Sequence, residues 1–369
     1  MSKIKVMQLL SPLTVAGAER VVLMLLRNID RTRFDVSLCL FLNTGRRTNP
    51  FTEEISKLDI PTEFIYLDKI FRWNYVRQLR NLLAKHEVEI LHSHSHRADI
   101  TGYFANRRWG AKLVSTVHGW TSSTGKVRFY EALDRWVLGK FDRVIAVSDD
   151  VRRVLVRRGI QEDKIKTITN AIDFSAYSKG SGRAAFRERA GIGNGDIVIG
   201  TVGRLSREKA LGDFLEMARI LSDKREDLRF VIVGDGPEKS EILRLRDHLG
   251  LDGKVKILGY EPEVGAVYEG IDVFVLTSRS EGLPISLLES AYFQKPFVAT
   301  AVGGIPEVFG EVGILVPPGD IDAMAGKILA LLDHPAERDR YSKRLHDFVQ
   351  RNCNANDWIL KIQQVYTSQ

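Results

Sequence analysis

Short, uninterrupted apolar runs alternate with longer amphipathic segments along the entire chain. Such runs are typical of strands buried on both faces of a parallel sheet, and the amphipathic segments are typical of the helices that cover it. The alternation predicts an α/β protein built by repeated βαβ winding. The expected strands are Ile4–Leu10, Phe34–Phe41, Thr62–Tyr66, Ile90–His92, Leu113–Thr116, Arg143–Val147, Ile165–Thr169, Ile197–Val202, Phe230–Val233, Val255–Leu258, Val273–Leu276, Pro296–Ala299 and Ile314–Val316.

A polar segment rich in glycine, residues 178 to 195, separates the strands into two sets. Its composition is typical of a linker. We therefore expect two Rossmann-like domains, each with a doubly wound parallel sheet, over residues 1–178 and 196–356. The end of the chain, residues 357–369, carries apolar residues at helical spacing and predicts a last helix.

The stretch from Ser278 to Glu289 predicts an anion-binding site. It follows the run Val273–Leu276 and precedes apolar residues at helical spacing, so it links a strand to a helix. Gly282 permits a tight turn, and Pro284 suits the first helical turn, where a missing N–H has no consequence. The free N–H groups and the positive dipole end of this helix favour a bound phosphate.

Two carboxylates, Glu281 and Glu289, flank this expected phosphate-binding site. Eight helical residues rise about 12 Å, whereas the carboxyl pairs of glycoside hydrolases lie about 5 to 9.5 Å apart. The spacing therefore disfavours hydrolysis if the interval is helical, and it suits a diphosphate with hydroxyls on both sides, as in a nucleotide sugar. The structural alternative is that Glu281 caps the helix electrostatically and Glu289 belongs to a solvated face.

Two further glycine turns are candidate ligand-binding loops, and the residues of the first suit the same diphosphate. Gly203 and Arg204 follow the expected strand Ile197–Val202, and Lys209 comes shortly afterwards. Arginine can donate two hydrogen bonds to phosphate oxygens, and lysine adds a point charge. In the first domain, Gly17 stands at a helix start after the first strand, at the edge where open α/β sheets bind ligands. The alternative for Gly17 is an ordinary tight turn.

Histidines gather where strands of the first domain end. His92, His94 and His96 alternate at a period of two, which on one strand would place three imidazoles on a common face, as in a metal site. The strand is expected to end near Ser93, however, and neither carboxylate nor cysteine accompanies the three, so we expect cleft residues and no metal. His118 ends another strand at the same edge and is a further candidate for a residue that lines the cleft. The alternative is a histidine buried in the core.

In their order and spacing, these motifs resemble family 4 of the retaining glycosyltransferases, which have the GT-B fold. The resemblance rests on Glu281 and Glu289 with seven residues between them, on Gly203-Arg204-Leu205 with Lys209, and on Gly303-Gly304-Ile305-Pro306-Glu307-Val308. It extends from Ala16-Gly17-Ala18-Glu19-Arg20 to Pro317-Pro318-Gly319-Asp320 and so covers nearly the whole chain. The family usually has glycine after the lysine, where this chain has Ala210.

The resemblance implies retaining transfer of a hexose from a nucleotide diphosphate sugar, with a UDP-sugar expected, to a glycan or lipid-linked acceptor. The product would be a cell-surface polysaccharide or lipopolysaccharide. It also implies two domains that face across a cleft, with the last helix, 357–369, crossing back to the first domain.

The resemblance assigns roles to the candidate site residues. Donor binding falls to Gly17, Arg204, Lys209, Glu281, Gly282, Leu283 and Glu289; catalysis falls to His118, Glu281, Arg204 and Lys209; and the acceptor side holds Glu19, Arg20, His94 and His118. Glu289 should hold ribose hydroxyls, and Glu281 should hold hydroxyls of the hexose. Arg204, Lys209 and the N–H groups after Gly282 would stabilise the leaving diphosphate, so we expect no metal and no other cofactor.

The formal net charge of +7 is unevenly distributed. Residues 1–180 hold 30 Lys and Arg against 19 Asp and Glu, a balance of +11, whereas residues 181–369 hold 24 against 28, a balance of −4. A basic half is compatible with anionic lipid, an anionic acceptor, nucleic acid or an ordinary solvated surface. The segment from Phe71 to His86 carries Arg72, Arg77 and Arg80 beside an apolar side; it is expected to be a crossover helix, with a membrane-surface helix as the alternative.

Composition narrows the cellular setting. No apolar run approaches the roughly 20 residues that span a bilayer, and the N-terminus lacks the shape of a signal peptide, so we expect a cytoplasmic protein. The basic first half adds the expectation of peripheral contact with an anionic membrane, at the inner face of the cell membrane. Cys39 and Cys353 have no metal or redox spacing, so both are expected to be buried free thiols.

Three other functions compete with glycosyl transfer. A GT-B-fold epimerase would have the same two sheets and the same phosphate-binding site, but it would convert the sugar nucleotide without an acceptor. A non-catalytic sugar-nucleotide-binding protein would have the same phosphate-binding site but would show no turnover. A nucleic-acid-binding module would explain the basic half, but no aromatic stacking pattern or groove-reading motif accompanies it, and no nucleic acid is expected.

Overall fold

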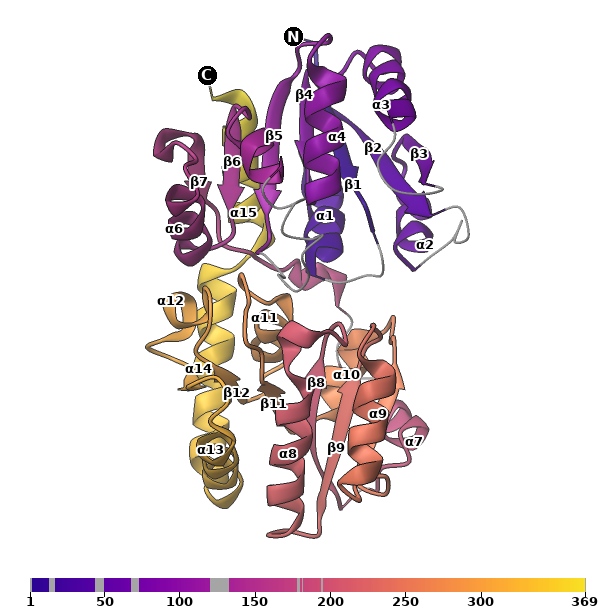
Figure 1. Cartoon of the computed structure of the whole chain (residues 1–369). Helices are drawn as coiled ribbons and strands as arrows, with labels where there is room; N and C mark the ends of the chain where they lie inside the picture. The colour runs from indigo at the N-terminus through magenta and orange to yellow at the C-terminus, as the bar shows by residue number, and fades with distance from the viewer. Residues whose placement is uncertain are drawn as a thin grey trace. The chain divides into compact units, whose positions relative to one another are not determined.

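The structure is a computed structural model, and it describes residues 2–12, 17–43, 50–67, 73–119, 133–177, 180, 182–193 and 195–368 (Figure 1). The chain forms two compact units. The first comprises Met1–Asn170 and Ala355–Gln369, and the second comprises Ala171–Asn354.

The first unit is built on a parallel sheet of seven strands in the order β3-β2-β1-β4-β5-β6-β7. The strands are β1 (Ile4–Leu10), β2 (Phe34–Asn43), β3 (Thr62–Leu67), β4 (Ile90–Ser93), β5 (Lys112–Val117), β6 (Arg143–Ala146) and β7 (Ile165–Thr167). Each coincides with an expected strand to within two residues at either end. The central strands are buried along their length, which is why their sequences read as continuous apolar runs.

Helices cover this sheet (Figure 1). They are α1 (Gly17–Asn28), α2 (Pro50–Ser56), α3 (Trp73–Lys85), α4 (His96–Asn106), α6 (Asp149–Arg157) and α15 (Ala355–Thr367), with a 3-10 turn, η1, at Glu162–Lys164. The last of these, α15, comes from the end of the chain and packs on α1 within the first unit. Its buried residues, Trp358, Ile362 and Tyr366 among them, recur at helical spacing and explain why this stretch adds to the first core.

The second unit is built on a parallel sheet of six strands in the order β10-β9-β8-β11-β12-β13. The strands are β8 (Ile197–Val202), β9 (Leu228–Val233), β10 (Val255–Gly259), β11 (Val273–Leu276), β12 (Phe297–Thr300) and β13 (Ile314–Val316). The helices are α7 (Arg183–Arg189), α8 (Leu211–Ser222), α9 (Lys239–His248), α10 (Val264–Gly270), α11 (Ile285–Tyr292), α12 (Ile305–Phe309), α13 (Ile321–Asp333) and α14 (Pro335–Asn352), with 3-10 turns η2 (Phe174–Ala176) and η3 (Arg207–Lys209).

Residues 178–195 were expected to form a linker between the domains. Instead, this segment contains helix α7 and belongs to the second unit. Phe186, on α7, is buried and lies so close to Gly270 that a side chain at that glycine would collide with its ring. Arg187 is buried beside it, with its guanidinium 2.6 Å from Asp272 Oδ2. These contacts hold α7 in the second unit, which begins at Ala171.

The strand order reverses between β1 and β4 in the first unit and between β8 and β11 in the second. In open α/β sheets, ligands bind at the carboxyl ends of the strands beside such a reversal. The segments that follow β8 and β11 carry Arg204, Lys209 and Glu281, and those that follow β4 and β5 carry His94 and His118.

Two simpler expectations can be compared with the described residues. Cys39 and Cys353 are both buried free thiols, as predicted. No helix among the described residues is long and apolar enough to cross a bilayer.

Candidate functional site

An ion pair joins the two main donor-site motifs of the second unit. Lys209 Nζ lies 2.5 Å from Glu281 Oε1, although the two residues follow different strands, β8 and β11. Ser278 Oγ donates a hydrogen bond of 2.6 Å to the same carboxylate oxygen. The lysine and glutamate side chains are 18% and 10% exposed, so the pair is largely withdrawn from water but still accessible. The sequence predicted both residues, but their contact was not predicted.

A small pocket adjoins this ion pair. Its polar lining comes from Gly203, Arg204 and Lys209, and its floor is apolar, with Leu205, Leu211, Ile232, Val233 and Leu276. Arg204 is exposed, and within the described part of the chain its guanidinium has no ion pair or hydrogen bond. The pocket therefore presents one cation without a counter-charge and a second that is shared with Glu281.

Two glycines pack closely against the backbone of the loops that carry Arg204 and Glu281. Gly234 adopts φ +143°, and a side chain there would collide with the carbonyl oxygen of Gly203. Gly303 adopts φ +58°, and a side chain there would collide with the carbonyl oxygen of Glu281. Gly304 N also donates to Gly282 O at 2.7 Å. These glycines follow β9 and β12, and they allow the close backbone approach that fixes the two ligand-facing loops.

The helix after Glu281 begins one residue later than expected. α11 starts at Ile285, and Pro284 is its N-cap residue with extended backbone, φ −72° and ψ 126°, so Pro284 precedes the first helical turn. No side chain caps this end, which leaves its N–H groups to another acceptor. Leu283 is buried, so this segment can offer only backbone groups to a ligand there.

Glu289 lies inside the second unit and is 1% exposed. The hydroxyl of Tyr177 donates to its Oε1 at 2.6 Å, and the hydroxyl of Tyr268 donates to its Oε2 at 2.8 Å. The alternative of a solvated face residue is therefore wrong. Because α11 covers only Ile285 to Glu289 of the interval, the rise expected for a fully helical spacing does not apply either; instead, Glu281 and Glu289 are held by different partners.

Ala210, which stands where the resembled family usually has glycine, adopts φ 47° and ψ 48°. This is the left-handed region, which disfavours residues with a Cβ. The turn after Lys209 therefore keeps a glycine-like conformation despite the substitution, and the lysine remains at the pocket.

Three buried or half-buried imidazoles meet at the ends of β4 and β5 in the first unit. The rings of His92 and His94 lie 4.2 Å apart, and those of His94 and His118 lie 5.8 Å apart. β4 ends at Ser93, as expected, and His96 stands on α4. The possible face of His92, His94 and His96 on one strand therefore does not form.

Hydrogen bonds tie this histidine cluster to the last helix. His92 Nδ1 and Nε2 bond to Tyr366 Oη at 2.7 Å and to Thr116 Oγ1 at 2.8 Å. Gln8 Nε2 donates to the same tyrosine oxygen at 2.9 Å, and Gln8 Oε1 lies 2.8 Å from His94 Nε2. The sequence signal for Gln8 and Thr116 was a polar residue inside an otherwise apolar strand.

The cluster is neutral at physiological pH. Burial, and secondarily the nearby His118, lowers the pKa of His92 to about 3, and burial lowers the pKa of His118 to about 4. Burial also holds the pKa of His94 well below its usual range. Among the described residues, His94 Nδ1 and His118 Nε2 are covered and lack a hydrogen-bond partner. Each is a ring nitrogen that a ligand hydroxyl could satisfy.

The remaining first-unit candidates lie on α1. The helix begins at Gly17, which is exposed, with open space where a Cβ would stand. Glu19 is buried and Arg20 is half-buried. Residues 13–16, directly before Gly17, lie outside the described residues.

The chain contains an Asp-x-Asp triplet, a pattern that can bind a metal with a diphosphate, at Asp320 to Asp322. Asp320 is the N-cap of α13, and its Oδ1 accepts a hydrogen bond of 3.0 Å from Ala323 N. The triplet therefore has a helix-capping role in this structure.

The family models and the relatives that match this chain are all glycosyltransferases. Residues 15–176 match the model of Glycosyltransferase Family 4, and residues 182–347 match the model of Glycosyl transferases group 1. The chain is similar to the UDP-Gal:alpha-D-GlcNAc-diphosphoundecaprenol alpha-1,3-galactosyltransferase of Escherichia coli, with 25% identity over 380 residues that cover 99% of this chain and 97% of that protein. It is also similar to the alpha-D-kanosaminyltransferase of Streptomyces kanamyceticus, with 27% identity over 82% of this chain and 84% of that protein.

Solved structures agree on the fold. The crystal structure of Anabaena HepE in complex with UDP and glucose matches with a TM-score of 0.87 and 20% identity, over 99% of this chain and 100% of that one. WaaG, a glycosyltransferase involved in lipopolysaccharide biosynthesis, matches with a TM-score of 0.78 and 15% identity, over 99% of this chain and 100% of that one. The chain therefore belongs to glycosyltransferase family 4, and its two parallel-sheet units form the GT-B fold.

Proposed function

We propose that this chain transfers a hexose from a UDP-sugar to a glycan or lipid-linked acceptor, with retention at the anomeric carbon, in the synthesis of a cell-surface polysaccharide or lipopolysaccharide. The observation that carries the proposal is the convergence of Arg204, Lys209 and Glu281 beside the strand reversal of the second unit. The name of the E. coli relative, which includes a UDP-galactose donor and a diphosphoundecaprenol acceptor, supports the choice of donor and acceptor class.

The leaving diphosphate is the group that this pocket suits. When the bond between the anomeric carbon and the phosphate oxygen breaks, its electron pair stays on the diphosphate, and negative charge grows there. The uncompensated guanidinium of Arg204 and the ammonium of Lys209 would stabilise that charge, together with the free N–H groups at the start of α11. Glu281, already at hydrogen-bond distance from Lys209, would turn toward hydroxyls of the hexose.

Glu289 has a narrower role in this proposal. Its two oxygens already accept hydrogen bonds from Tyr177 and Tyr268, so a ribose hydroxyl would bind as an additional donor. A carboxylate has lone pairs for more than one donor at each oxygen. We propose that the two tyrosines hold the carboxylate in position for that contact.

The acceptor reaction requires no side chain as a strong base. An imidazole whose burial lowers its pKa to about 4, as for His118, is a weak proton acceptor at neutral pH. We propose that His118 and His94 accept hydrogen bonds from sugar hydroxyls, with Glu19 and Arg20 also on the acceptor side. The acceptor hydroxyl would attack the anomeric carbon from the face that the diphosphate leaves, and its proton would pass to the departing phosphate oxygen.

The phosphate charge has protein partners in this scheme, so we propose that transfer requires no metal. The decisive experiment measures acceptor-dependent release of UDP or GDP from a panel of nucleotide sugars, with glycan and lipid-linked acceptors, in EDTA and in Mg²⁺ or Mn²⁺. We expect UDP release that needs the acceptor and persists in EDTA, and a product with unchanged anomeric configuration by NMR.

The alternatives give different results in the same experiment. A new sugar epimer formed without acceptor would identify an epimerase. Donor binding without any turnover would identify a non-catalytic sugar-nucleotide-binding protein. Activity lost in EDTA and restored by Mg²⁺ would contradict the metal-free scheme.

A further inference from the structure

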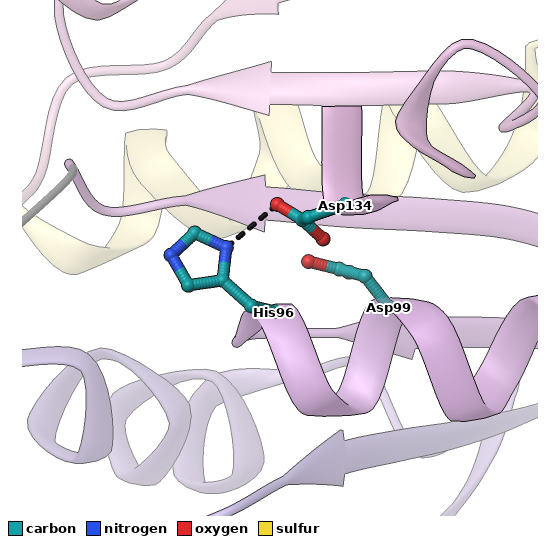
Figure 2. Close-up of side chains that lie close together, drawn as sticks. All are labelled: His96, Asp99 and Asp134. Atoms are coloured by element: carbon teal, nitrogen blue, oxygen red, sulfur yellow. Dashed lines mark hydrogen bonds and ion pairs between the residues drawn. The ribbon is translucent and has the colours of Figure 1, made fainter. Parts of the chain in front are cut away.

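Three potential metal ligands lie together in the first unit. His96 and Asp99 stand on the first turns of α4, and Asp134 stands on a second helical segment, residues 133–138. One ligand atom from each residue lies within 4.8 Å of the others. Figure 2 shows the His96 ring directed at one oxygen of Asp134, while the carboxylates of Asp99 and Asp134 face each other. The His96 Nδ1 to Asp134 Oδ2 distance is 2.6 Å.

The two carboxylates are buried and face each other (Figure 2). Asp99 is 3% exposed and Asp134 is 1% exposed. Ser93 Oγ donates to Asp99, but Asp134 Oδ1 is covered and has no hydrogen-bond partner among the described residues. Burial and the charge of Asp134 raise the pKa of Asp99 well above its usual range. A buried carboxylate oxygen without a donor calls for an explanation, and an ion between the two groups supplies one.

We propose that His96, Asp99 and Asp134 bind a divalent cation. Two carboxylate oxygens and one imidazole nitrogen form a donor set that suits Mn²⁺ or Zn²⁺ better than a soft, thiolate-seeking metal. In a tetrahedral site with bonds of about 2.0 to 2.1 Å, ligand atoms lie about 3.3 Å apart, so the atoms need only small side-chain rotations. Water would complete the coordination, because His96 is 37% exposed and opens the site to solvent.

The proposed ion would act on the first unit's stability rather than on the donor. It would cross-link α4 to the segment 133–138, two elements that are far apart in sequence. The donor pocket belongs to the second unit and uses none of these residues. The proposal is therefore independent of the glycosyl-transfer mechanism, and it is compatible with turnover in EDTA.

The test starts from the full chain stripped with EDTA and desalted. Mn²⁺ is titrated by electron paramagnetic resonance of the free ion, with calorimetry in parallel, and melting is followed with and without the metal. We expect one site per chain and a higher Tm with Mn²⁺. Asp134→Asn and His96→Gln should each weaken Mn²⁺ binding by about tenfold or more, since even groups that only orient a ligand matter by that factor. His96→Gln changes a partly exposed side chain, so it remains informative if Asp134→Asn does not fold.

His86→Gln is the matched control. His86 Nε2 lies 2.8 Å from Glu63 Oε1, which gives the same histidine–carboxylate pair in the same unit without a second carboxylate. This variant should bind Mn²⁺ like the wild type. No Mn²⁺ binding by the stripped wild type would overturn the proposal, as would full binding in both His96→Gln and Asp134→Asn. Loss of binding in His118→Gln alone would instead place the ion at the histidine cluster.

Discussion

At the residue scale, the most informative contact is the ion pair between Lys209 and Glu281. Each charge satisfies the other in a partly buried position, with Ser278 as an additional donor to the carboxylate. A diphosphate that enters the pocket would compete with Glu281 for the lysine ammonium. Arg204 differs, because its charge has no such partner in the described structure. The two cations should therefore affect catalysis similarly but stability differently.

Replacing Lys209 or Arg204 by Ala should reduce kcat/KM by about a hundredfold, equivalent to about 3 kcal/mol of transition-state stabilisation, by analogy with removal of a preorganised donor. Lys209→Ala should also lower the free energy of unfolding modestly, because it leaves Glu281 without its counter-charge. Steady-state kinetics and urea unfolding measure the two effects. Arg207→Ala is the matched control, since Arg207 is an exposed cation of the same 3-10 turn and should retain activity. Wild-type turnover in both Lys209→Ala and Arg204→Ala would place the diphosphate elsewhere.

Ala210→Gly should stabilise the second unit. Ala210 holds φ 47°, where a Cβ costs roughly 1 to 2 kcal/mol, and part of this is offset by the greater freedom of glycine in the unfolded chain. We expect a gain of up to about 1 kcal/mol in the free energy of unfolding. Gln294→Gly is the comparison, because Gln294 also has positive φ, 53°, but follows α11 at its other end. Both variants should raise Tm, and a lower Tm for Ala210→Gly would show that the turn is not strained.

At the element scale, the histidine cluster connects β4 and β5 to the C-terminal helix α15. Tyr366 Oη contacts both His92 and Gln8, and Lys112 Nζ, at the first residue of β5, donates to Val365 O at 2.8 Å. The buried imidazoles must be neutral for this arrangement, because burial lowers the pKa of each one. Packing of the last helix on the first unit is thus linked to the protonation of β4 and β5 residues.

The first unit should lose stability as the pH falls from 6.5 to 5. In this window the unfolded chain protonates histidines of ordinary pKa, near 6.5, whereas His92 and His118 stay neutral in the folded chain until about pH 3 and 4. Each contributes about 1 kcal/mol of lost stability per pH unit. Asp99, whose pKa is raised, acts in the opposite direction, but a single carboxyl does not offset three histidines. Carboxyls of lowered pKa, such as Glu63, contribute only at lower pH.

Urea unfolding at pH 7 and pH 5, in EDTA, measures this effect. His118→Gln should reduce the acid sensitivity, because one titrating group is removed. His334→Gln changes an exposed histidine at the start of α14 and should leave the sensitivity unchanged. Equal stability at the two pH values would contradict the buried, neutral cluster.

Periodicity located the strands well, because each strand carries its own apolar run. It failed at α7, whose sequence Arg183 to Arg189 shows one large apolar residue, Phe186. Arg187 of this helix is buried with an ion pair to Asp272 and hydrogen bonds to backbone carbonyl oxygens, which no local pattern reveals. Pattern also cannot reveal pairwise contacts between distant positions. Tyr177 and Tyr268 on Glu289, and Gly303 behind Glu281, depend on backbone geometry that no single segment encodes.

At the scale of the whole molecule, the balance of +11 in residues 1–180 contrasts with −4 in the remainder. The first unit also exposes large aromatic side chains: Phe64 and Tyr66 on β3, Trp73 at the start of α3, and Trp109 after α4. α3 contacts both β3 and α4, so these aromatic groups belong to neighbouring elements. Exposed aromatic rings beside arginines are typical of a surface that meets the headgroup region of a bilayer.

We therefore propose peripheral, salt-reversible binding of the first unit to anionic membranes, which would bring a lipid-linked acceptor to the enzyme. Arg77, Arg107 and Arg108 are exposed and Arg80 is half-buried, whereas Arg72 lies outside the described residues. Each well-placed cation should contribute about 1 kcal/mol at an anionic surface, screened over about 8 Å at physiological salt. A variant with Ser at these five positions should lose most of its binding in vesicle co-sedimentation at low salt.

The charge-matched control carries Ser at five exposed cations of the second unit, Arg219, Lys224, Arg244, Lys327 and Arg351. It changes the net charge by the same amount, so a general charge effect would weaken binding equally in both variants, whereas a first-unit surface would leave the control bound. Trp73→Ser adds a third arm at low salt, because Trp73 is 69% exposed and its loss should weaken binding without a change in charge. Equal binding of the wild type to neutral and anionic vesicles, or none at low salt, would leave the basic half as ordinary solvated surface and would favour a soluble acceptor.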